Sequence, residues 1–292
     1  MAMYLHRVGA ASEPAPRRWG PRECALYAIG IGAGWDELAF VREGPGQLVY
    51  PSFVLSGVMA AEAEAWPDPG FATGEYAPHE IVQGEQGLVL YAEVLPRGDV
   101  LSHTRVAAIW DKGSGALVVL EIEAADRASG RPLFTATTSL FVKGHGGFGG
   151  ERGPRGPRRD PPQRPPDLRV SHATLPIQTL LWRHAGNDPN AIHVDPEVAR
   201  RAGFRAPILS GLNTLGFACR ALVHAAAGGA PGRLRSLAGR FANPASNGDV
   251  LTTELWTGDD LGRDERGDRV VLFRVANQDG LALVEGGRAT LA

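Results

Sequence analysis

The sequence lacks the features that would place the protein in a membrane, on a secretory route or on nucleic acid. No stretch approaches about 18 apolar residues without a charge or a glycine, so no membrane span is expected. Residues 1–20 lack the unbroken apolar core of a signal peptide. The formal net charge of −2 gives no electrostatic reason to expect binding to nucleic acid or to an anionic membrane.

Cysteine is scarce as well. The two cysteines, Cys24 and Cys219, lie far apart and form no C-x-x-C pair. Cys219 stands in an apolar stretch and is most simply a small buried hydrophobic residue. This usage favours a reducing, cytoplasmic environment.

Two glycine-rich stretches lack the order that nucleotide binding requires. Residues 26–34 (LYAIGIGAG) contain no G-x-G-x-x-G and precede no βαβ pattern, which favours a structural role for their glycines. Residues 144–167 are rich in Gly, Pro and Arg, but no Gly-Lys-Ser/Thr follows them. Because this segment has little to bury, we interpret it as a solvated, flexible linker.

Length and patterning indicate two similar units. A chain of 292 residues, 43% hydrophobic and 21% charged, suits two packed units of roughly 130–150 residues each. After an extended lead-in over residues 1–22, the first unit has a predicted helix over 53–65, and the second has one over 176–184. The β-rich runs are 81–95, 100–112, 115–127, 132–143, 168–175, 233–243, 249–258, 268–278 and 281–292. This order predicts an α+β fold, with an N-terminal unit (1–145), a linker (146–167) and a C-terminal unit (168–292).

The two units also repeat in residues. Residues 54–58 (VLSGV) match 208–212 (ILSGL), and 98–101 (GDVL) match 248–251 (GDVL), at separations of 154 and 150 residues. Such agreement is typical of an old duplication. The first unit contains nothing like the D-x-N-x-x-H motif that the second unit carries, so we place the chemistry in the second unit. The first unit keeps the fold and offers binding surface.

That motif consists of Asp188, Asn190 and His193 on a segment rich in turn-forming residues. A carboxylate, an amide and an imidazole in one water-excluding pocket can bind and activate a water molecule, an effect of roughly 10²–10⁴-fold in rate. Asp195 followed by Pro196 predicts a helix cap and a short helix, which ends at a glycine.

A second, apolar helix is predicted to begin at Gly211, with Ser210 as its cap. The Gly211 N–H at the positive end of the helix dipole is suited to polarise a carbonyl oxygen. The apolar residues that follow, from Leu212 on, predict a buried helix wrapped by a sheet.

Each of these residues has a purely structural alternative. Asp188, Asn190 and Asp195 are common turn and cap residues, and an isolated His193 is more often structural than catalytic. The combination of acid, amide, imidazole and a glycine-led helix in one segment favours chemistry. A metal site is disfavoured because the set lacks a third nitrogen or sulfur ligand.

This region resembles the (R)-specific 2-enoyl-CoA hydratases, the hydratase 2 or MaoC-like dehydratase family, which includes the hydratase part of the peroxisomal multifunctional β-oxidation enzyme. The family pattern is approximately Y-R-x-S-G-D-x-N-P-L-H-I-D-P followed by A-G-F-x-x-P-I-L-H-G-L-x-T-x-G. It is matched by residues 182–196, 202–204 and 207–216. Residues 83–86 (QGEQ) stand where HGEQ is common in the family, so the resemblance covers most of the chain.

The resemblance implies a double hotdog, in which two long helices are each wrapped by a curved antiparallel sheet and the sheets join side by side. It implies a homodimer, an acyl-CoA thioester bound between the halves, and no metal or redox cofactor. Asp188 and His193 would activate water for syn addition across the C2–C3 double bond, Asn190 would orient the site, and the Gly211 N–H would hold the thioester oxygen. Ser210 and Leu212 would contact the substrate.

The sequence departs from the family pattern at four places. One additional residue after Arg183 makes Asn187 an alternative to Asp188, and the spacing to His193 favours Asp188. The other departures replace the family's proline, histidine and tyrosine: Ala191, Ser210 and Trp182. These changes alter the pocket and suggest an unusual acyl group or a carrier-protein thioester.

We therefore predict a hydro-lyase of fatty acid metabolism that interconverts trans-2-enoyl-CoA and (R)-3-hydroxyacyl-CoA. The alternatives are a dehydratase acting on phosphopantetheine thioesters of a carrier protein in polyketide or fatty-acid synthesis, a hotdog thioesterase, and a catalytically silent acyl-thioester-binding protein. Acyl chain length and the direction of the reaction stay open at this point.

Overall fold

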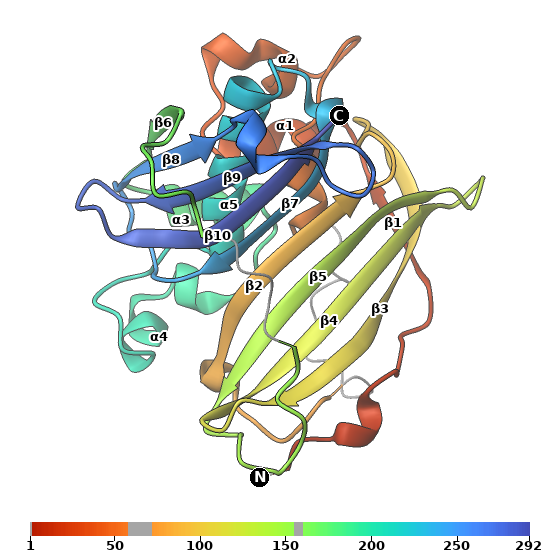
Figure 1. Cartoon of the computed structure of the whole chain (residues 1–292), viewed down its shortest axis with the longest axis vertical. Coiled ribbons are helices and arrows are strands. Elements are labelled where there is room, and N and C mark those ends of the chain that lie inside the picture. The colour runs from red at the N-terminus through yellow and green to blue at the C-terminus, as the bar shows by residue number, and fades with distance from the viewer. Residues whose placement is uncertain (1, 58–71, 155–159) are drawn as a thin grey trace.

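The computed structural model describes residues 2–57, 72–154 and 160–292, and its strands form one antiparallel sheet in the order β1-β3-β4-β5-β2-β7-β10-β9-β8-β6 (Figure 1). The first-half strands are β1 (Ala15–Trp19), β2 (Ile81–Leu90), β3 (Gly98–Asp111), β4 (Gly115–Asp126) and β5 (Pro132–Lys143). The second-half strands are β6 (Leu168–Ala173), β7 (Leu234–Phe241), β8 (Val250–Trp256), β9 (Arg269–Ala276) and β10 (Ala282–Leu291). Each β-rich run of the sequence therefore contains a strand.

The two halves join at strands β2 and β7. Their antiparallel register runs from Glu85 opposite Arg240 to Val89 opposite Ser236. Within this pair, Leu88 and Leu237 lie opposite each other, and both side chains are buried. The joint is therefore held by ladder hydrogen bonds and by a shared hydrophobic core, as cross-strand apolar pairs generally provide.

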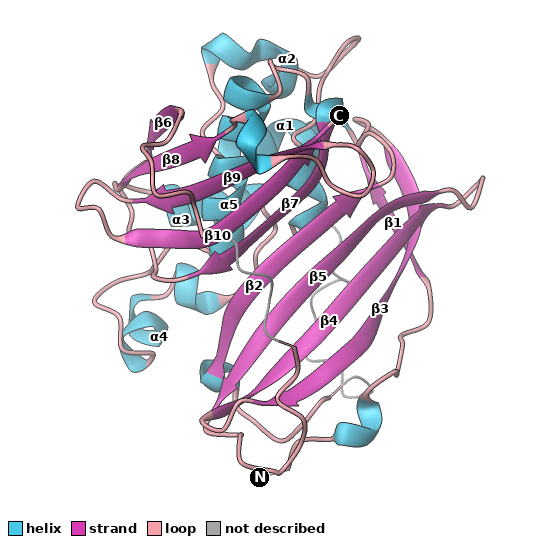
Figure 2. Cartoon of the chain, in the orientation of Figure 1, coloured by secondary structure: helices cyan, strands magenta, loops and turns pink. Residues whose placement is uncertain are grey.

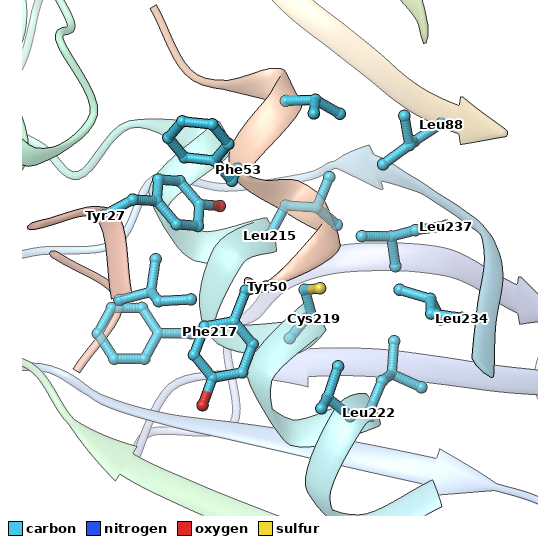
Figure 3. Close-up of a cluster of buried hydrophobic side chains, with 14 of the residues drawn as sticks. Tyr27, Tyr50, Phe53, Leu88, Leu215, Phe217, Cys219, Leu222, Leu234 and Leu237 are labelled. Atoms are coloured by element: carbon cyan, nitrogen blue, oxygen red, sulfur yellow. The ribbon is translucent and has the colours of Figure 1, made fainter. Parts of the chain in front are cut away.

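Helix α5 (Gly211–Ala221) is the centre of the second half and continues into a π-helical turn, Leu222–Ala226. Figure 3 shows its buried side chains among residues of β2 and β7. The completely buried residues of this helix include Leu215, Phe217, Cys219 and Leu222. The prediction of an apolar helix wrapped by a sheet is confirmed. No helix in the described ranges has the length and apolar composition needed to cross a membrane.

The first half differs from the expected plan. The predicted helix over 53–65 begins inside a 3₁₀ turn, Pro51–Leu55, and residues 58–71 lie outside the described residues. The lead-in contains a 3₁₀ turn, Leu5–Arg7, before the extended strand β1, and helix α1 (Pro21–Gly30) begins within it, so the prediction of an extended segment is correct only in part. Proline at the first helical position suits such a start. Residues 26–30 of the glycine-rich stretch are helical, so their structural interpretation is confirmed.

Helix α1 packs against helix α3 (Gln178–Ala185), which corresponds to the helix predicted over 176–184. The contact requires glycine, because a Cβ at Gly30 would lie 2.5 Å from the Cβ of Ala185. Gln178 adds a hydrogen bond of 2.7 Å from its side-chain amide to the Gly30 carbonyl. In Figure 2 these helices lie, with α5, behind the second-half strands.

The described parts of the linker are held to the rest of the molecule. The Asp111 carboxylate accepts hydrogen bonds from the N–H groups of Gly113, Gly147 and Gly149 at 2.8, 2.8 and 2.9 Å. These bonds lower the pKa of Asp111, because they stabilise its charged form. Farther along, the Arg164 carbonyl accepts from the Trp256 indole at 3.0 Å. The N–H groups of Gly147 and Gly149 in the glycine-rich segment thus bind a carboxylate of the chain itself, and these stretches are more ordered than a freely flexible linker.

A cluster of charged groups closes the C-terminal end of α5. Glu37, at the end of the 3₁₀ turn Trp35–Glu37, accepts hydrogen bonds from Tyr50 at 2.8 Å and from Arg220 Nε at 2.9 Å. Its Oε1 also lies 2.5 Å from His224 Nε2. Burial alone would raise the pKa of Glu37, but the bonds from Arg220 and Tyr50 outweigh burial and lower it. The carboxylate therefore stays ionised and fixes this end of the helix.

Beside this cluster, His172 of β6 makes stability depend on pH. Its Nδ1 is buried without a partner among the described residues, and burial, with Arg220 as the second cause, lowers its pKa to about 4. Because the unfolded chain binds this proton at an ordinary histidine pKa of about 6.5, the protein loses stability as the pH falls from about 6.5 to about 4. Of the other nearby charged groups, Glu37 opposes the shift and His224 adds to it.

Between pH 7.5 and pH 4.5, we expect the free energy of unfolding of His172→Gln to fall by about 2 kcal/mol less than that of the wild type. Urea unfolding at pH 7.5 and at pH 4.5 would measure it, with His184→Gln at an exposed histidine as the control. Parallel pH dependence of the His172 variant and the wild type would contradict this prediction.

Candidate active site

The loop between α3 and helix α4 (Pro196–Arg201) carries the D-x-N-x-x-H motif. Asn190 Oδ1 accepts from the Ile192 N–H at 3.2 Å and begins a 3₁₀ turn, Ala191–His193. Asp195 accepts from the N–H groups of Glu197 and Val198, which confirms the predicted helix cap. Turn and cap bonds therefore determine the path of the loop on both sides of the histidine.

His193 faces Asp188. The distance between His193 Nε2 and Asp188 Oδ2 is 3.8 Å, and the two side chains are 11% and 15% exposed. His193 Nδ1 lies 2.8 Å from the Ile208 carbonyl oxygen. Since a carbonyl can only accept, Nδ1 carries the hydrogen, so in the neutral form of the ring Nε2 is an acceptor on the side of Asp188. Two acceptors thus face each other across a gap too long for a direct hydrogen bond.

The Asp188 carboxylate is held at both oxygens. The Trp182 indole N–H donates to Oδ2 at 3.0 Å, and the Asn190 backbone N–H donates to Oδ1 at 3.0 Å. Arg183 donates to the Asp188 carbonyl at 2.8 Å. The sequence pattern marks Trp182 only as a replacement for tyrosine. Tryptophan itself indicates a hydrogen-bond donor at this position, because a buried indole N–H needs an acceptor.

The structure distinguishes Asn187 from Asp188 by position. The Asn187 side chain is turned toward the first half, where its amide donates to the Gly57 carbonyl at 3.2 Å. Its φ of 47° lies in the left-handed region, which Asn tolerates better than most residues. Asp188 is therefore the residue beside His193. The side chain of Asn190 is a cap, and Asn190 reaches the carboxylate through its backbone N–H.

Gly211 is the first residue of α5, so its N–H has no acceptor within the helix. A Cβ at this position would lie 2.9 Å from the Phe241 ring, which explains the need for glycine. Ser210 is buried at the N-cap, although its side chain makes no capping hydrogen bond, and Leu212 packs against the core. The Ile208 carbonyl that anchors His193 belongs to the same short segment, which connects the imidazole to the helix start.

Neither cysteine is suited to act as a nucleophile. Burial raises the pKa of Cys219 to about 11 and that of Cys24 to about 12. Both thiols therefore stay protonated at neutral pH, and the thiolate is the reactive form of cysteine. The interpretation of Cys219 as a buried hydrophobic residue is confirmed, since its side chain is completely buried.

Family models and relatives cover both halves of the chain. Residues 158–277 match the MaoC like domain, and residues 18–144 match the MFE-2 hydratase 2 N-terminal domain. The 3-hydroxyacyl-thioester dehydratase Y of Mycobacterium tuberculosis is 39% identical over 286 residues, covering 96% of this chain and 94% of its own length. The peroxisomal enoyl-CoA hydratase 2 of Arabidopsis thaliana is 34% identical over 256 residues, covering 82% of each chain.

Solved structures agree with these matches. The MaoC-like dehydratase from Phytophthora capsici superposes with a TM-score of 0.84 at 27% identity, covering 99% of this chain and 97% of its own. A Mycobacterium tuberculosis protein described as a double hotdog superposes with a TM-score of 0.56 at 14% identity, covering 97% and 96%. The expected double hotdog fold is therefore confirmed. The chain belongs to the family of MaoC-like dehydratases and 2-enoyl-CoA hydratases 2.

Proposed function

We propose that this protein hydrates trans-2-enoyl-CoA thioesters to (R)-3-hydroxyacyl-CoA with a water molecule activated by Asp188 and His193. The protein is an enzyme of the hydro-lyase class, as its relatives named enoyl-CoA hydratase 2 and 3-hydroxyacyl-thioester dehydratase indicate. The residues that act, the stereochemistry and the acyl carrier are our proposal.

The observation that carries the proposal is the pair of facing acceptors, Asp188 Oδ2 and His193 Nε2, 3.8 Å apart. A water molecule has two hydrogens and can donate one to each acceptor at an ordinary distance of about 2.8 Å. Water held in this way has its oxygen lone pairs free for attack. A thioesterase reaction would also use water, but the hydration reaction is the one that the family relatives favour.

In the proposed step the water oxygen bonds to C3 of the enoyl group. One water proton passes through the acid–base pair to C2 on the same face, so the addition is syn and the atoms balance. Negative charge develops on the thioester oxygen, and the Gly211 N–H stabilises it. Loss of one such donor costs about 3–4 kcal/mol of the barrier in known cases. The addition of water is redox-neutral overall, so the step as written needs no redox cofactor.

The expected result is rapid loss of the conjugated enoyl-thioester absorbance when the purified protein meets trans-2-enoyl-CoA substrates of several chain lengths. Chiral analysis should identify the (R)-alcohol as the product. Release of free thiol instead would support a thioesterase. No turnover with any CoA ester would contradict the proposal in its present form.

A second candidate is a dehydratase that acts on carrier-protein-bound 3-hydroxyacyl thioesters. It is favoured by the 39% identity to the 3-hydroxyacyl-thioester dehydratase and by Ser210, which stands in place of the family's histidine before Gly211. The same assay with pantetheine and carrier-protein esters distinguishes the two candidates. In either case we expect a cytoplasmic homodimer.

A further inference from the structure

We propose that Trp182 is a positioning residue, which orients the Asp188 carboxylate toward His193, and that the first half of the chain holds Trp182 in place. This inference rests on the proposed function of Asp188. It assigns to the first half a part in building the site, in addition to any contact with the acyl chain.

Hydrogen bonds to both oxygens fix the orientation of the Asp188 carboxylate. Asp188 Oδ2 receives the Trp182 indole N–H at 3.0 Å, and this same oxygen lies 3.8 Å from His193 Nε2. Oδ1 receives the Asn190 N–H at 3.0 Å. With one donor on each oxygen, rotation of the carboxylate breaks at least one charge-assisted hydrogen bond. The second lone pair of Oδ2 therefore keeps its direction toward the gap beside His193.

Residues of the first half hold the indole. Trp182 is 1% exposed, and its ring meets that of Tyr27 on α1 edge to face, with centroids 5.7 Å apart. The Tyr27 hydroxyl donates to Ser52 Oγ at 2.8 Å, and its ring contacts Phe53 at 5.6 Å (Figure 3). Gly186 also lies close to the indole, since a Cβ at this position would lie 2.4 Å from it. The Trp182 ring cannot tilt unless these neighbours move.

Two other buried tryptophans show what a purely structural indole does in this protein. Trp19 donates to the Leu95 carbonyl at 2.9 Å, and Trp256 donates to the Arg164 carbonyl at 3.0 Å. Each satisfies its N–H with a backbone carbonyl. Trp182 instead donates to a carboxylate that faces a histidine. This difference provides a matched control.

Trp182→Phe removes the N–H and keeps most of the ring. We expect kcat for enoyl-CoA hydration to fall about 10–100-fold, which corresponds to one charge-assisted hydrogen bond, while KM changes less than about twofold. Trp256→Phe also loses a buried indole hydrogen bond, and its kcat should equal that of the wild type. Equal kinetics of the Trp182 and Trp256 variants would overturn the inference.

A second measurement does not require the Trp182 variant to fold. In the 15N-labelled protein, the six tryptophans give indole N–H resonances. In Asp188→Asn, which keeps the size of the side chain, one of them should move upfield, because its acceptor loses its charge. If no indole resonance moves, the inference is wrong. If Asp188→Asn is fully active, the proposed role of Asp188 fails instead, and the two failures are therefore distinguishable.

Discussion

Asp188→Asn should reduce kcat for enoyl-CoA hydration by roughly 10²–10⁴-fold with little change in the fold. The amide has nearly the shape of the carboxylate, but it cannot take up the water proton. One of its two polar atoms also becomes a donor, which disturbs the pair of acceptors 3.8 Å apart. The absorbance assay with a trans-2-enoyl-CoA measures the loss, and the circular dichroism spectrum monitors the fold.

Asp195→Asn is the matched control for this variant. Asp195 lies on the same loop and caps α4, and asparagine is an equally good cap, so activity and stability should be retained. His193→Ala should lose a similar factor, and the double variant should be no worse than either single variant, because residues that act as a unit are not additive. Wild-type activity in Asp188→Asn would contradict the assignment, and Asn187→Ala would then test the alternative.

Gly57→Ala should be the most damaging small substitution in the first half. A Cβ at Gly57 would lie 1.9 Å from the Asn187 carbonyl oxygen, which belongs to the backbone of the motif loop. Two hydrogen bonds join these segments, from the Gly57 N–H to the Gly186 carbonyl at 2.7 Å and from the Asn187 amide to the Gly57 carbonyl at 3.2 Å. The methyl group must push the loop away and break them.

A shift of about 1 Å at a reacting group costs on the order of 10²-fold in rate, so we expect at least that loss of kcat from Gly57→Ala. Overpacking and the lost hydrogen bonds should also lower the free energy of unfolding by about 2–4 kcal/mol. Gly34→Ala is the control, since a Cβ there meets nothing within 4 Å. Wild-type kinetics in the Gly57 variant would show that the motif loop does not depend on this contact.

The strands could be predicted because β-rich runs are bounded by turn residues, as the run 115–127 lies between Gly113-Ser114-Gly115 and Ser129-Gly130-Arg131. Helix α1 could not be predicted. Its buried residues include Cys24 and Tyr27, but Leu26 and Ile29 on the same helix are 38% and 40% exposed, so the sequence shows no clear apolar face. The helix packs against α3, which is far away in the sequence.

The motif residues Asp188 and His193 were identified from their types and spacing, and the structure places them side by side. The orientation of Asn187 and the identity of the acceptor of the Trp182 indole N–H were not accessible in this way. They depend on contacts with Gly57 and Tyr27, which no local pattern reveals. Tertiary contacts between the halves therefore supply the part of the site that sequence reasoning could not.

The pairing of β2 with β7 has a consequence for assembly. If the two halves were separate molecules, β2 and β7 would pair only above some protein concentration. Dilution would then separate the halves and abolish the site. In one chain the meeting of the two edges is intramolecular, so its effective concentration is set by the connecting segment and not by the amount of protein. The contacts of Gly57 with the motif loop and of Tyr27 with Trp182 should thus persist at any dilution at which the chain stays folded.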